Sequence, residues 1–445
     1  MELLNAIPVI GPILGSVLPF LLVLGVVVFV HEYGHYIVGR WCGIHAETFS
    51  IGFGKELFAW VDKRGTRWRL AALPLGGYVK FLGDADASSS GVDEDKMAHL
   101  SAEQRVHSFP GAALWRRAAT VSAGPAANFL LSIMIFGASA LWFGLPDERP
   151  IVGEVTEQGT GFTDLRPGDL VLAVDGTPVA DFSAFVEAAT LGGVPSHILT
   201  VDRGGETISV ESAPLIPPVA TYVMKGAPAD VAGMQPGDLM IAVNGAPVTS
   251  FSDVQTAIKA AGEASVEVTV RRAEQDVALM ITPKINPIPQ PDGSVEMRPL
   301  IGVSGSPLVR AALYTPNPLE AIGFGAARTW GVVANTFSYL DKIIGGEADA
   351  SGLGGPVKIA SMSGEAAENG IGALIGMIAL ISTSIGLINL FPIPVLDGGH
   401  LVFYAIEAVR GKPLSSRVAE AATGVGLAMV IALMVFVTWN DISGL

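Results

Sequence analysis

The chain has 445 residues, which is enough for several domains. Half of its residues are hydrophobic and 16% are charged, against about 25% in ordinary soluble domains, so the composition predicts a chain that contacts both lipid and water. The formal net charge of −15 argues against nucleic acid as a partner, because phosphates repel an acidic chain. Cys42 is the single cysteine, which excludes an internal disulfide and a thiolate metal site.

Four stretches of the chain contain no Asp, Glu, Lys or Arg and are long enough to cross a bilayer, which takes about 20 apolar residues in a helix. The stretches are 3–30, 118–146, 369–396 and 421–440. Core helices of soluble proteins rarely run this long without a charge, so we expect transmembrane helices within 1–45, 114–146, 367–400 and 418–440. The first stretch follows Glu2 rather than basic residues and has no clear cleavage site, so we expect a retained helix and not a signal peptide.

Basic residues cluster in two of the loops between these stretches. Eleven of the 27 Lys and Arg residues lie between Arg40 and Arg117, three more lie within 410–417, and none follows the fourth stretch. Cytoplasmic loops carry the excess of Lys and Arg, so we expect both loops in the cytoplasm. The protein would then be a multi-pass protein of a bacterial inner membrane, with both termini and the region 147–368 in the periplasm.

The first apolar stretch ends in the HExxH motif His31-Glu32-Tyr33-Gly34-His35. Residues four apart share one face of a helix, so His31 and His35 can hold one zinc ion between them. Glu32 lies beside them, where it can take a proton from a zinc-bound water molecule. Ionisable residues within an apolar segment are costly, which favours a functional role over polar residues that only reach for the interface at a helix end.

A catalytic zinc site needs a third protein ligand and an open position for water. Asp397 follows the uncharged third stretch on its expected cytoplasmic side, at the depth of His31 and His35. Pro392 and Pro394 cannot continue a regular helix, so we expect the backbone to open just before Asp397. We therefore predict Asp397 as the third ligand, although an Asp-Gly pair is also typical of an ordinary turn.

Four further residues around Asp397 stand out in the sequence. Gly398 and Gly399 are expected to allow a tight turn. His400 is a weaker candidate for the third ligand. Asn389, an amide within an apolar helix, could bind a substrate carbonyl or could bridge two helices.

The segment 46–113 contains runs typical of strands on either side of a plausible hairpin turn at 62–65. We expect a membrane-associated β-hairpin region here. Its free edge could pair with an extended substrate and replace the hydrogen bonds that a helical segment loses when it unwinds in an apolar setting. The alternative is a cytoplasmic hairpin that only seals the helix bundle.

The region between the second and third stretches contains an internal repeat with an offset of 69 residues. Leu165-Arg-Pro-Gly-Asp recurs as Met234-Gln-Pro-Gly-Asp, followed in each copy by an apolar strand and an Asp-Gly or Asn-Gly turn. Each copy resembles a PDZ domain, and we expect two PDZ-like domains at 150–217 and 218–290. Their grooves could select peptides by strand addition. We favour exclusion of large substrates by size, because neither copy has an obvious carboxylate-binding loop.

The residues that follow the repeat, 291–366, are expected to form a linker and an amphipathic helix. The segment 318–345 mixes aromatic and charged side chains in a way that suits a helix lying on the outer leaflet.

The HExxH motif in the first helix and the phrase Asn389-Leu-Phe-Pro-Ile-Pro-Val-Leu-Asp-Gly-Gly in a later one resemble the site-2 protease family of intramembrane zinc metalloproteases. The chain resembles the bacterial regulator-of-sigma-E-protease branch over nearly its whole length, in three further phrases: Phe49-Ser-Ile-Gly-Phe-Gly-Lys55, Pro74-Leu-Gly-Gly-Tyr-Val-Lys80 and Gly124-Pro-Ala-Ala-Asn128. The resemblance implies that His31, His35 and Asp397 are zinc ligands and that Glu32 is the catalytic acid/base. The substrate-binding residues that it implies are Asn389, Pro392, Pro394, Gly76, Gly77 and Tyr78.

The implied fold is a polytopic α-helical membrane protein with four transmembrane helices, a membrane-associated β-hairpin region and two periplasmic PDZ-like α+β domains. The implied activity is hydrolysis of peptide bonds within transmembrane segments of single-span membrane proteins. An anti-sigma factor already shortened by another protease is the leading expected substrate, and remnant signal peptides are the second. Two other functions stay open: a metal-dependent membrane scaffold or receptor that does not cut, and a metal transporter, which would leave the paired repeats unexplained.

Overall fold

The computed structural model describes residues 10–85, 93–156, 161–190, 194–289, 295–346 and 354–443. The start of the stretch predicted from residue 3 lies outside these residues. The chain divides into two compact units, the first formed by Met1–Leu141 with Asn317–Leu445 and the second by Trp142–Pro316.

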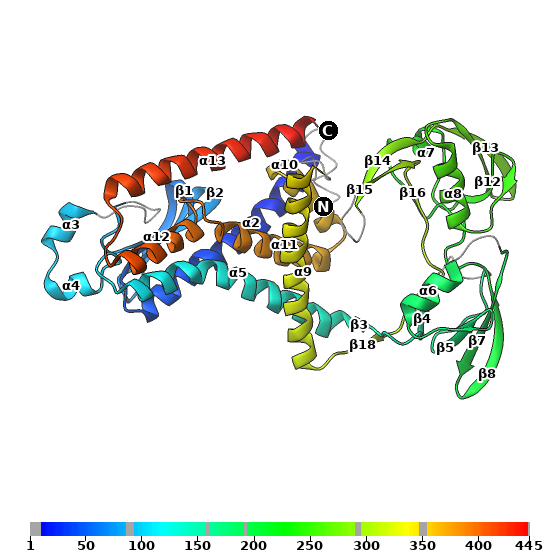
Figure 1. The fold of residues 1–445 in the computed structure, drawn as a ribbon, viewed down its shortest axis with the longest axis horizontal. Coiled ribbons are helices and arrows are strands. Elements are labelled where there is room, and N and C mark those ends of the chain that lie inside the picture. Colours follow the sequence, from blue (N-terminus) through cyan, green and yellow to red (C-terminus); the bar gives the residue numbers. More distant parts are fainter. Residues whose placement is uncertain are drawn as a thin grey trace. The chain divides into compact units, whose positions relative to one another are not determined.

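Among the described residues, four helices of the first unit are long and apolar enough to cross a membrane. They are α2 (Ile10–Trp41), α5 (Leu114–Phe143), α11 (Ile371–Asn389) and α13 (Ser416–Ser443) (Figure 1). At most 44% of the most apolar 18-residue stretch of each helix is buried within the protein. The apolar surface that stays exposed therefore needs lipid around it. The prediction of a polytopic helical membrane protein with additional β-rich regions is thus confirmed.

The third predicted stretch, 367–400, is not a single helix. The helix α11 ends at Asn389, and Asp397 begins a separate helix, α12 (Asp397–Arg410). Pro392 and Pro394 lie in the turns between the two helices, because proline lacks the N–H that a continuing helix needs. The backbone therefore opens before Asp397 as expected, but Asp397 does not belong to the membrane-spanning helix.

The spanning helices approach one another through small residues and hydroxyl groups. A Cβ atom at Gly34 of α2 would overlap the backbone oxygen of Ala123 in α5. The hydroxyl of Ser132 in α5 donates a hydrogen bond of 2.8 Å to the Ala379 carbonyl in α11, and Ser382 of α11 donates one of 2.9 Å to the Asn128 carbonyl. Such contacts favour helix association in lipid, where apolar burial alone gives little driving force.

Two further helices, α9 (Pro318–Gly345) and α10 (Pro356–Glu368), belong to the first unit. The helix α9 occupies the segment predicted as helical at 318–345, and its first turn is closed by a capping box between Asn317 and Glu320. It crosses α5 where Gly137 and Gly325 leave no room for a Cβ between the two backbones (Figure 1).

A curved antiparallel sheet follows α2. It consists of β1 (Ala46–Val61) and β2 (Arg67–Phe81), which are joined at the turn predicted at 62–65, and two short helices, α3 (Glu94–His99) and α4 (Ala102–Val106), come after it. The first half of β1 pairs with both ends of β2, since Thr48 lies opposite both Arg67 and Lys80.

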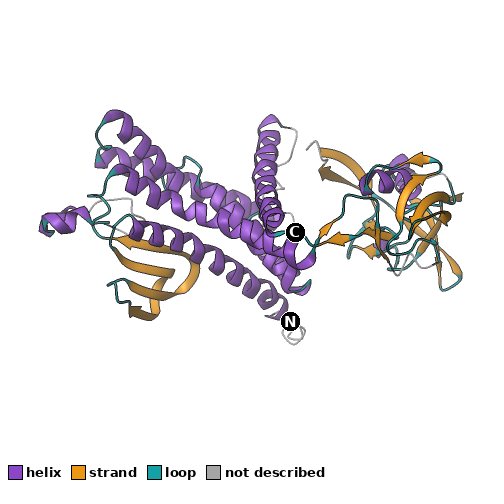
Figure 2. Cartoon of the chain, turned by 90° about the horizontal axis from the view of Figure 1, so that it is seen from below, coloured by secondary structure: helices purple, strands orange, loops and turns teal. Residues whose placement is uncertain are grey.

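The bend in β1 falls at Gly52 and Gly54, whose φ angles of 86° and 84° are in the left-handed region that favours glycine. Because of this bend, the segment 76–81 forms one edge of the sheet, and its Val79 and Phe81 share a buried cluster with Tyr36 of α2. Figure 2 shows the curved sheet beside the helix that begins near the N-terminus. The sheet edge is thereby fixed beside the helix that carries the HExxH motif.

The two copies of the sequence repeat fold alike within the second unit. Their four-stranded sheets have the equivalent orders β6-β5-β7-β8 and β11-β10-β12-β13, and the helices α6 (Phe182–Thr190) and α8 (Phe251–Ala261) occupy equivalent places. Each copy buries its own apolar core. The strands are β5 (Leu170–Val174), β6 (Thr177–Pro178), β7 (His197–Arg203), β8 (Glu206–Ser212), β10 (Leu239–Val243), β11 (Ala246–Pro247), β12 (Val266–Arg272) and β13 (Gln275–Ile281).

The predicted linker that begins at residue 291 is wrong over its first part. After the hairpin β14 (Lys284–Pro289) and β15 (Val295–Leu300), the chain returns through both copies of the repeat. The strand β16 (Val303–Ser304) pairs with β9 (Tyr222–Val223), and β17 (Val309–Ala311) pairs with β4 (Val152–Val155). The physical reason is burial: Ile301 completes the core of the second copy, and Leu308 and Val309 complete that of the first. The boundaries 150–217 and 218–290 therefore end each domain too early.

Candidate active site

The histidines of the HExxH motif lie one turn apart on α2, and both side chains are buried. Pro19 is the last proline in this helix, so the backbone hydrogen bonds continue without interruption through His31 and His35 to Trp41. The two imidazoles consequently project from one face of the helix, as the spacing predicts.

Asp397 reaches the histidines from the first turn of α12. Gly398 and Gly399 make this possible by close packing: a Cβ on Gly398 would overlap the carbonyl oxygens of Leu390 and Phe391, and one on Gly399 would overlap that of Ile393. Neither glycine has a positive φ. The expected tight turn at these glycines is therefore wrong, and their small size serves instead to seat α12 on the preceding loop.

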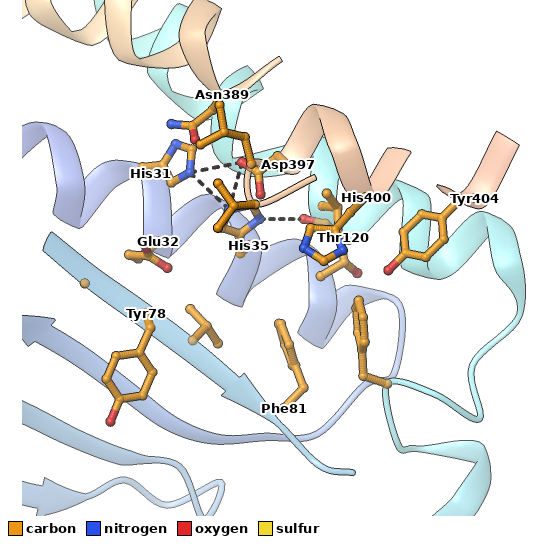
Figure 3. A pocket seen from close by; sticks show the side chains of 16 residues that line it. His31, Glu32, His35, Tyr78, Phe81, Thr120, Asn389, Asp397, His400 and Tyr404 are labelled. Atoms are coloured by element: carbon orange, nitrogen blue, oxygen red, sulfur yellow. Dashed lines mark hydrogen bonds and ion pairs between the residues drawn. The ribbon is translucent and has the colours of Figure 1, made fainter. Parts of the chain in front are cut away.

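Three side-chain atoms from these elements converge on one point (Figure 3). The two Nε2 atoms of His31 and His35 are 3.2 Å apart, and the Asp397 Oδ2 atom lies 3.2 Å from the first and 3.5 Å from the second. The Oδ2 atom is buried, and no hydrogen-bond donor among the described residues satisfies it. Two imidazole nitrogens and one carboxylate oxygen gathered this closely are able to bind a single metal cation.

The spacing of these atoms fits zinc. A tetrahedral zinc ion with bonds of about 2.0–2.2 Å requires its ligand atoms to lie about 3.3–3.6 Å apart. The three observed separations fall close to that range, and two imidazole nitrogens with one carboxylate oxygen form a donor set typical of catalytic zinc. Three ligands leave a fourth position for water or substrate.

The helix α5 supports both imidazoles from behind. The Nδ1 atom of His35 lies 2.9 Å from the Thr120 carbonyl oxygen, and the Nδ1 atom of His31 lies 3.1 Å from the side-chain amide of Asn128. Between these two residues, Gly124 lets the rings lie against the helix, because a Cβ there would overlap His35 and lie 2.9 Å from His31 Cε1.

Glu32 lines a cavity of about 200 Å³ together with the three converging residues. The edge strand of the sheet forms the opposite wall, where a Cβ on Gly77 would come within 3.0 Å of the Glu32 side chain and Val79 lines the same cavity. A carboxylate, a cation site and a strand edge therefore share one cavity.

Comparison with known proteins identifies the family. The sequence pattern of peptidase family M50 matches residues 19–433. The chain belongs to this family. It is 40% identical over 440 residues to a protein of Agrobacterium fabrum named as a zinc metalloprotease, a match that covers 98% of this chain and 97% of the relative. It is 32% identical over 461 residues to the regulator of sigma-E protease of Salmonella typhimurium, with 97% of this chain and 99% of the relative covered. The prediction of a site-2-type metalloprotease is confirmed.

The cavity of this M50 peptidase contains several of the residues predicted to bind substrate, but not all of them. Gly77, Tyr78 and Asn389 line it. Gly76, Pro392 and Pro394 are not among its lining residues: Gly76 faces the Phe53 ring, and Pro394 packs against Gly426 of α13. His400 also lines the cavity but is not part of the converging group, so the geometry favours Asp397 over His400 as the third ligand.

Sequence reasoning missed the supporting residues of α5. Thr120 contributes only a backbone carbonyl, which leaves no signal in the sequence. Gly124 and Asn128 had a signal, because they are the first and last residues of a phrase that resembles the regulator-of-sigma-E-protease branch, but the phrase alone assigns them no role.

Proposed function

We propose that this M50 peptidase hydrolyses peptide bonds within transmembrane segments of single-span membrane proteins, with a zinc ion held by His31, His35 and Asp397. The observation that carries the proposal is the convergence of these three donors, within one cavity with Glu32, among helices long enough to cross a membrane. Zinc bound there supplies a Lewis acid that polarises a carbonyl and makes a water molecule acidic near neutral pH.

Glu32 supplies the proton transfers. Its carboxylate lies in the cavity next to the metal ligands, so it can accept a proton from the attacking water and return that proton to the leaving amine. The burial of His31 and His35 excludes bulk water, which strengthens each of these electrostatic interactions.

The edge strand 76–81 presents the substrate. A helical substrate hides its peptide bonds in internal hydrogen bonds and must unwind before water can attack. Pairing with Gly77 and Val79 would replace these bonds and would hold the extended segment next to Glu32. Tyr78 and Asn389, which line the same cavity, would contact its side chains and carbonyl groups.

The substrate class and the orientation follow from the relatives and from the charges. A relative is named a regulator of sigma-E protease, which supports a membrane-bound anti-sigma factor shortened by an earlier outside cut as substrate, with remnant signal peptides as a second class. The basic residues of 40–117 and 410–417 support a cytoplasmic position for these loops of the inner-membrane protein. Both termini and the two PDZ-like domains would then lie in the periplasm, where the domains would exclude large substrates by size.

The experiment compares the full-length protein with Glu32→Gln, using a purified single-span test substrate in lipid nanodiscs. We expect Glu32→Gln to retain zinc at the wild-type ratio by elemental analysis and to lose hydrolysis by about 10²–10⁴-fold, because the proton acceptor is gone. New peptide ends are measured by mass spectrometry. Wild-type protein that binds the substrate without producing new ends would support a scaffold or receptor, and zinc flux that survives Glu32→Gln would support a transporter.

The trapped complex of the inactive variant also tests the strand pairing. In a Cys42→Ser, Glu32→Gln background, Tyr78→Cys is the only cysteine of the protease. We expect it to cross-link to substrate cysteines at alternating positions, because an extended strand repeats every two residues. Cross-links that repeat every three to four residues would show a helical substrate and would reject the pairing.

A further inference from the structure

Asn128 is an amide buried among apolar helices, and its contact with His31 is unexplained by packing alone. It lies on α5 and is fully buried. Its side-chain amide is 3.1 Å from His31 Nδ1, the ring nitrogen that faces away from Asp397. A buried amide in lipid is costly unless its hydrogen bonds are made, so its placement against one particular nitrogen needs a reason.

The tautomer of His31 supplies that reason. The Nε2 atom of His31 faces His35 and Asp397, so it must carry a lone pair when it binds a cation, and the ring proton must then lie on Nδ1. His35 already shows this arrangement, because its Nδ1 can donate to the Thr120 carbonyl at 2.9 Å. Among the described contacts of His31, no backbone carbonyl lies next to Nδ1. The Asn128 side chain lies there instead, as the Thr120 carbonyl lies next to Nδ1 of His35.

The orientation of the Asn128 amide decides what it can do. With Nδ2 toward His31, two hydrogen-bond donors face each other if Nδ1 is protonated, and the Asn128 Oδ1 atom is buried without a partner. The two ends of an amide have nearly the same shape, and the hydrogen-bond network assigns them. Turning the amide over places Oδ1 against the His31 N–H and gives the orphaned oxygen its partner.

We infer that Asn128 is a positioning residue, whose Oδ1 accepts a hydrogen bond from His31 Nδ1 and thereby keeps Nε2 free to bind the metal. The inference rests on the proposed metal site but not on proteolysis. The same helix therefore fixes both imidazoles, through a backbone carbonyl for His35 and a side-chain carbonyl for His31.

The test measures the affinity of the full-length, metal-free protein for Zn²⁺ by competition with a chromogenic chelator. Asn128→Leu keeps the size of the side chain but removes the acceptor, and we expect it to weaken zinc binding by about 10–100-fold. Asn128→Asp keeps an acceptor in the same place, and we expect its affinity to equal or exceed that of the wild type. Ser132→Ala is the matched control, because Ser132 is equally buried one turn later and its hydrogen bonds to the described residues go to the backbone carbonyls of Asn128 and Ala379.

The aspartate variant decides the orientation even if the leucine variant does not fold. If Asn128→Asp lost zinc affinity by more than about tenfold, the inference would be overturned. A carboxylate can accept but not donate, so such a loss would show that the wild-type amide acts by donating to His31. Wild-type affinity in a folded Asn128→Leu would overturn it as well. If the wild type binds zinc and the variants follow the expected order without any peptide hydrolysis, the inference stands and the proposed protease function fails.

Discussion

A single glycine sets how closely the metal-binding rings approach the helix behind them. Gly124 lies on α5 directly under His31 and His35, and a Cβ at this position would occupy the space of the His35 ring. Alanine is a better helix former than glycine by about 1 kcal/mol, so helix propensity alone favours alanine here. Steric room for the imidazoles is therefore the physical reason for glycine.

Gly124→Ala should weaken zinc binding by at least about tenfold, because the methyl group pushes the His35 ring away from the position that it shares with Asp397. Zinc content after dialysis, measured by elemental analysis, checks this. Gly376→Ala is the matched control, since a Cβ at Gly376 of α11 would meet no atom within 4 Å. Full zinc retention in Gly124→Ala would mean that the α2–α5 contact relaxes without disturbing the ligands.

The residues of the site differ in how far their roles can be predicted from the sequence. The geometry of His31 and His35 was predictable, because i and i+4 share a face in any helix. Asp397 was predictable from its depth and from the prolines before it. Gly124 and Asn128 were not, because their roles depend on which face of α5 meets α2, and no local pattern encodes that contact.

At the scale of elements, local sequence signals predicted most helices and the repeat, but they did not predict the pairing of strands that are far apart in the sequence. The turn at 62–65 and the equivalent strands of the two repeats follow from turn residues and apolar alternation. The pairing of β17 with β4 joins Val309 to Val155 across more than 150 residues. The segment that contains β16 and β17 has short strands and no repeat, so its sequence resembles a linker even though it completes both cores.

The turn before the first sheet strand of each repeat carries the same buried ion pair. In the first copy, Arg203 Nη2 lies 2.7 Å from Asp169 Oδ2, and in the second copy Arg272 Nη2 lies 2.6 Å from Asp238 Oδ2. Both aspartate side chains are 1% exposed. Burial raises the pKa of each carboxyl group, but hydrogen bonds from the arginine and from a backbone N–H outweigh it and hold the pKa below its usual value. The folded domains therefore bind these protons less readily than the unfolded chain.

These carboxylates should make both domains sensitive to acid. Their contribution is complete above about pH 4, the range of an unfolded aspartate, and is lost as the pH falls through the lower folded pKa. Asp169→Asn and Asp238→Asn should each lower the free energy of unfolding at pH 7 by about 2 kcal/mol and flatten its fall with acid. Hydrogen exchange in β7 and β12, pulse-labelled after equilibration at each pH, measures this.

Asp276→Asn is the control for this prediction. Asp276 pairs with Arg271 in the same domain, but both side chains are 50% exposed, so the pair contributes little. An effect of Asp276→Asn equal to that of Asp238→Asn would show that burial of the pair is not what matters.

At the scale of the whole molecule, the second unit is inserted into the first at one place. The chain enters it through β3 (Leu145–Pro146) and leaves it through β18 (Leu313–Tyr314), and these strands pair with each other. All three proposed zinc ligands and Glu32 belong to the first unit. The insertion can therefore be removed at this pair of strands without cutting an element that carries the site.

Replacing residues 147–312 by a short Gly-Ser turn should leave zinc binding unchanged and should relax substrate selection. If the two repeat domains exclude by size, the shortened protein should cleave a substrate with an intact folded outer domain about tenfold faster or more than the full-length protein does, a barrier change of about 1.4 kcal/mol. A substrate with only a short outer stub should be cleaved at similar rates by both, because size gives no reason to reject it. Cleavage rates in nanodiscs, followed on gels, give the ratio of the shortened to the full-length protein for each of the two substrates. The shortened protein with Glu32→Gln measures the background cleavage that does not come from this site. Equal rejection of the bulky substrate by both proteins would place the filter in the helical unit, and loss of cleavage of the stub substrate would show instead that the domains bind the substrate and deliver it.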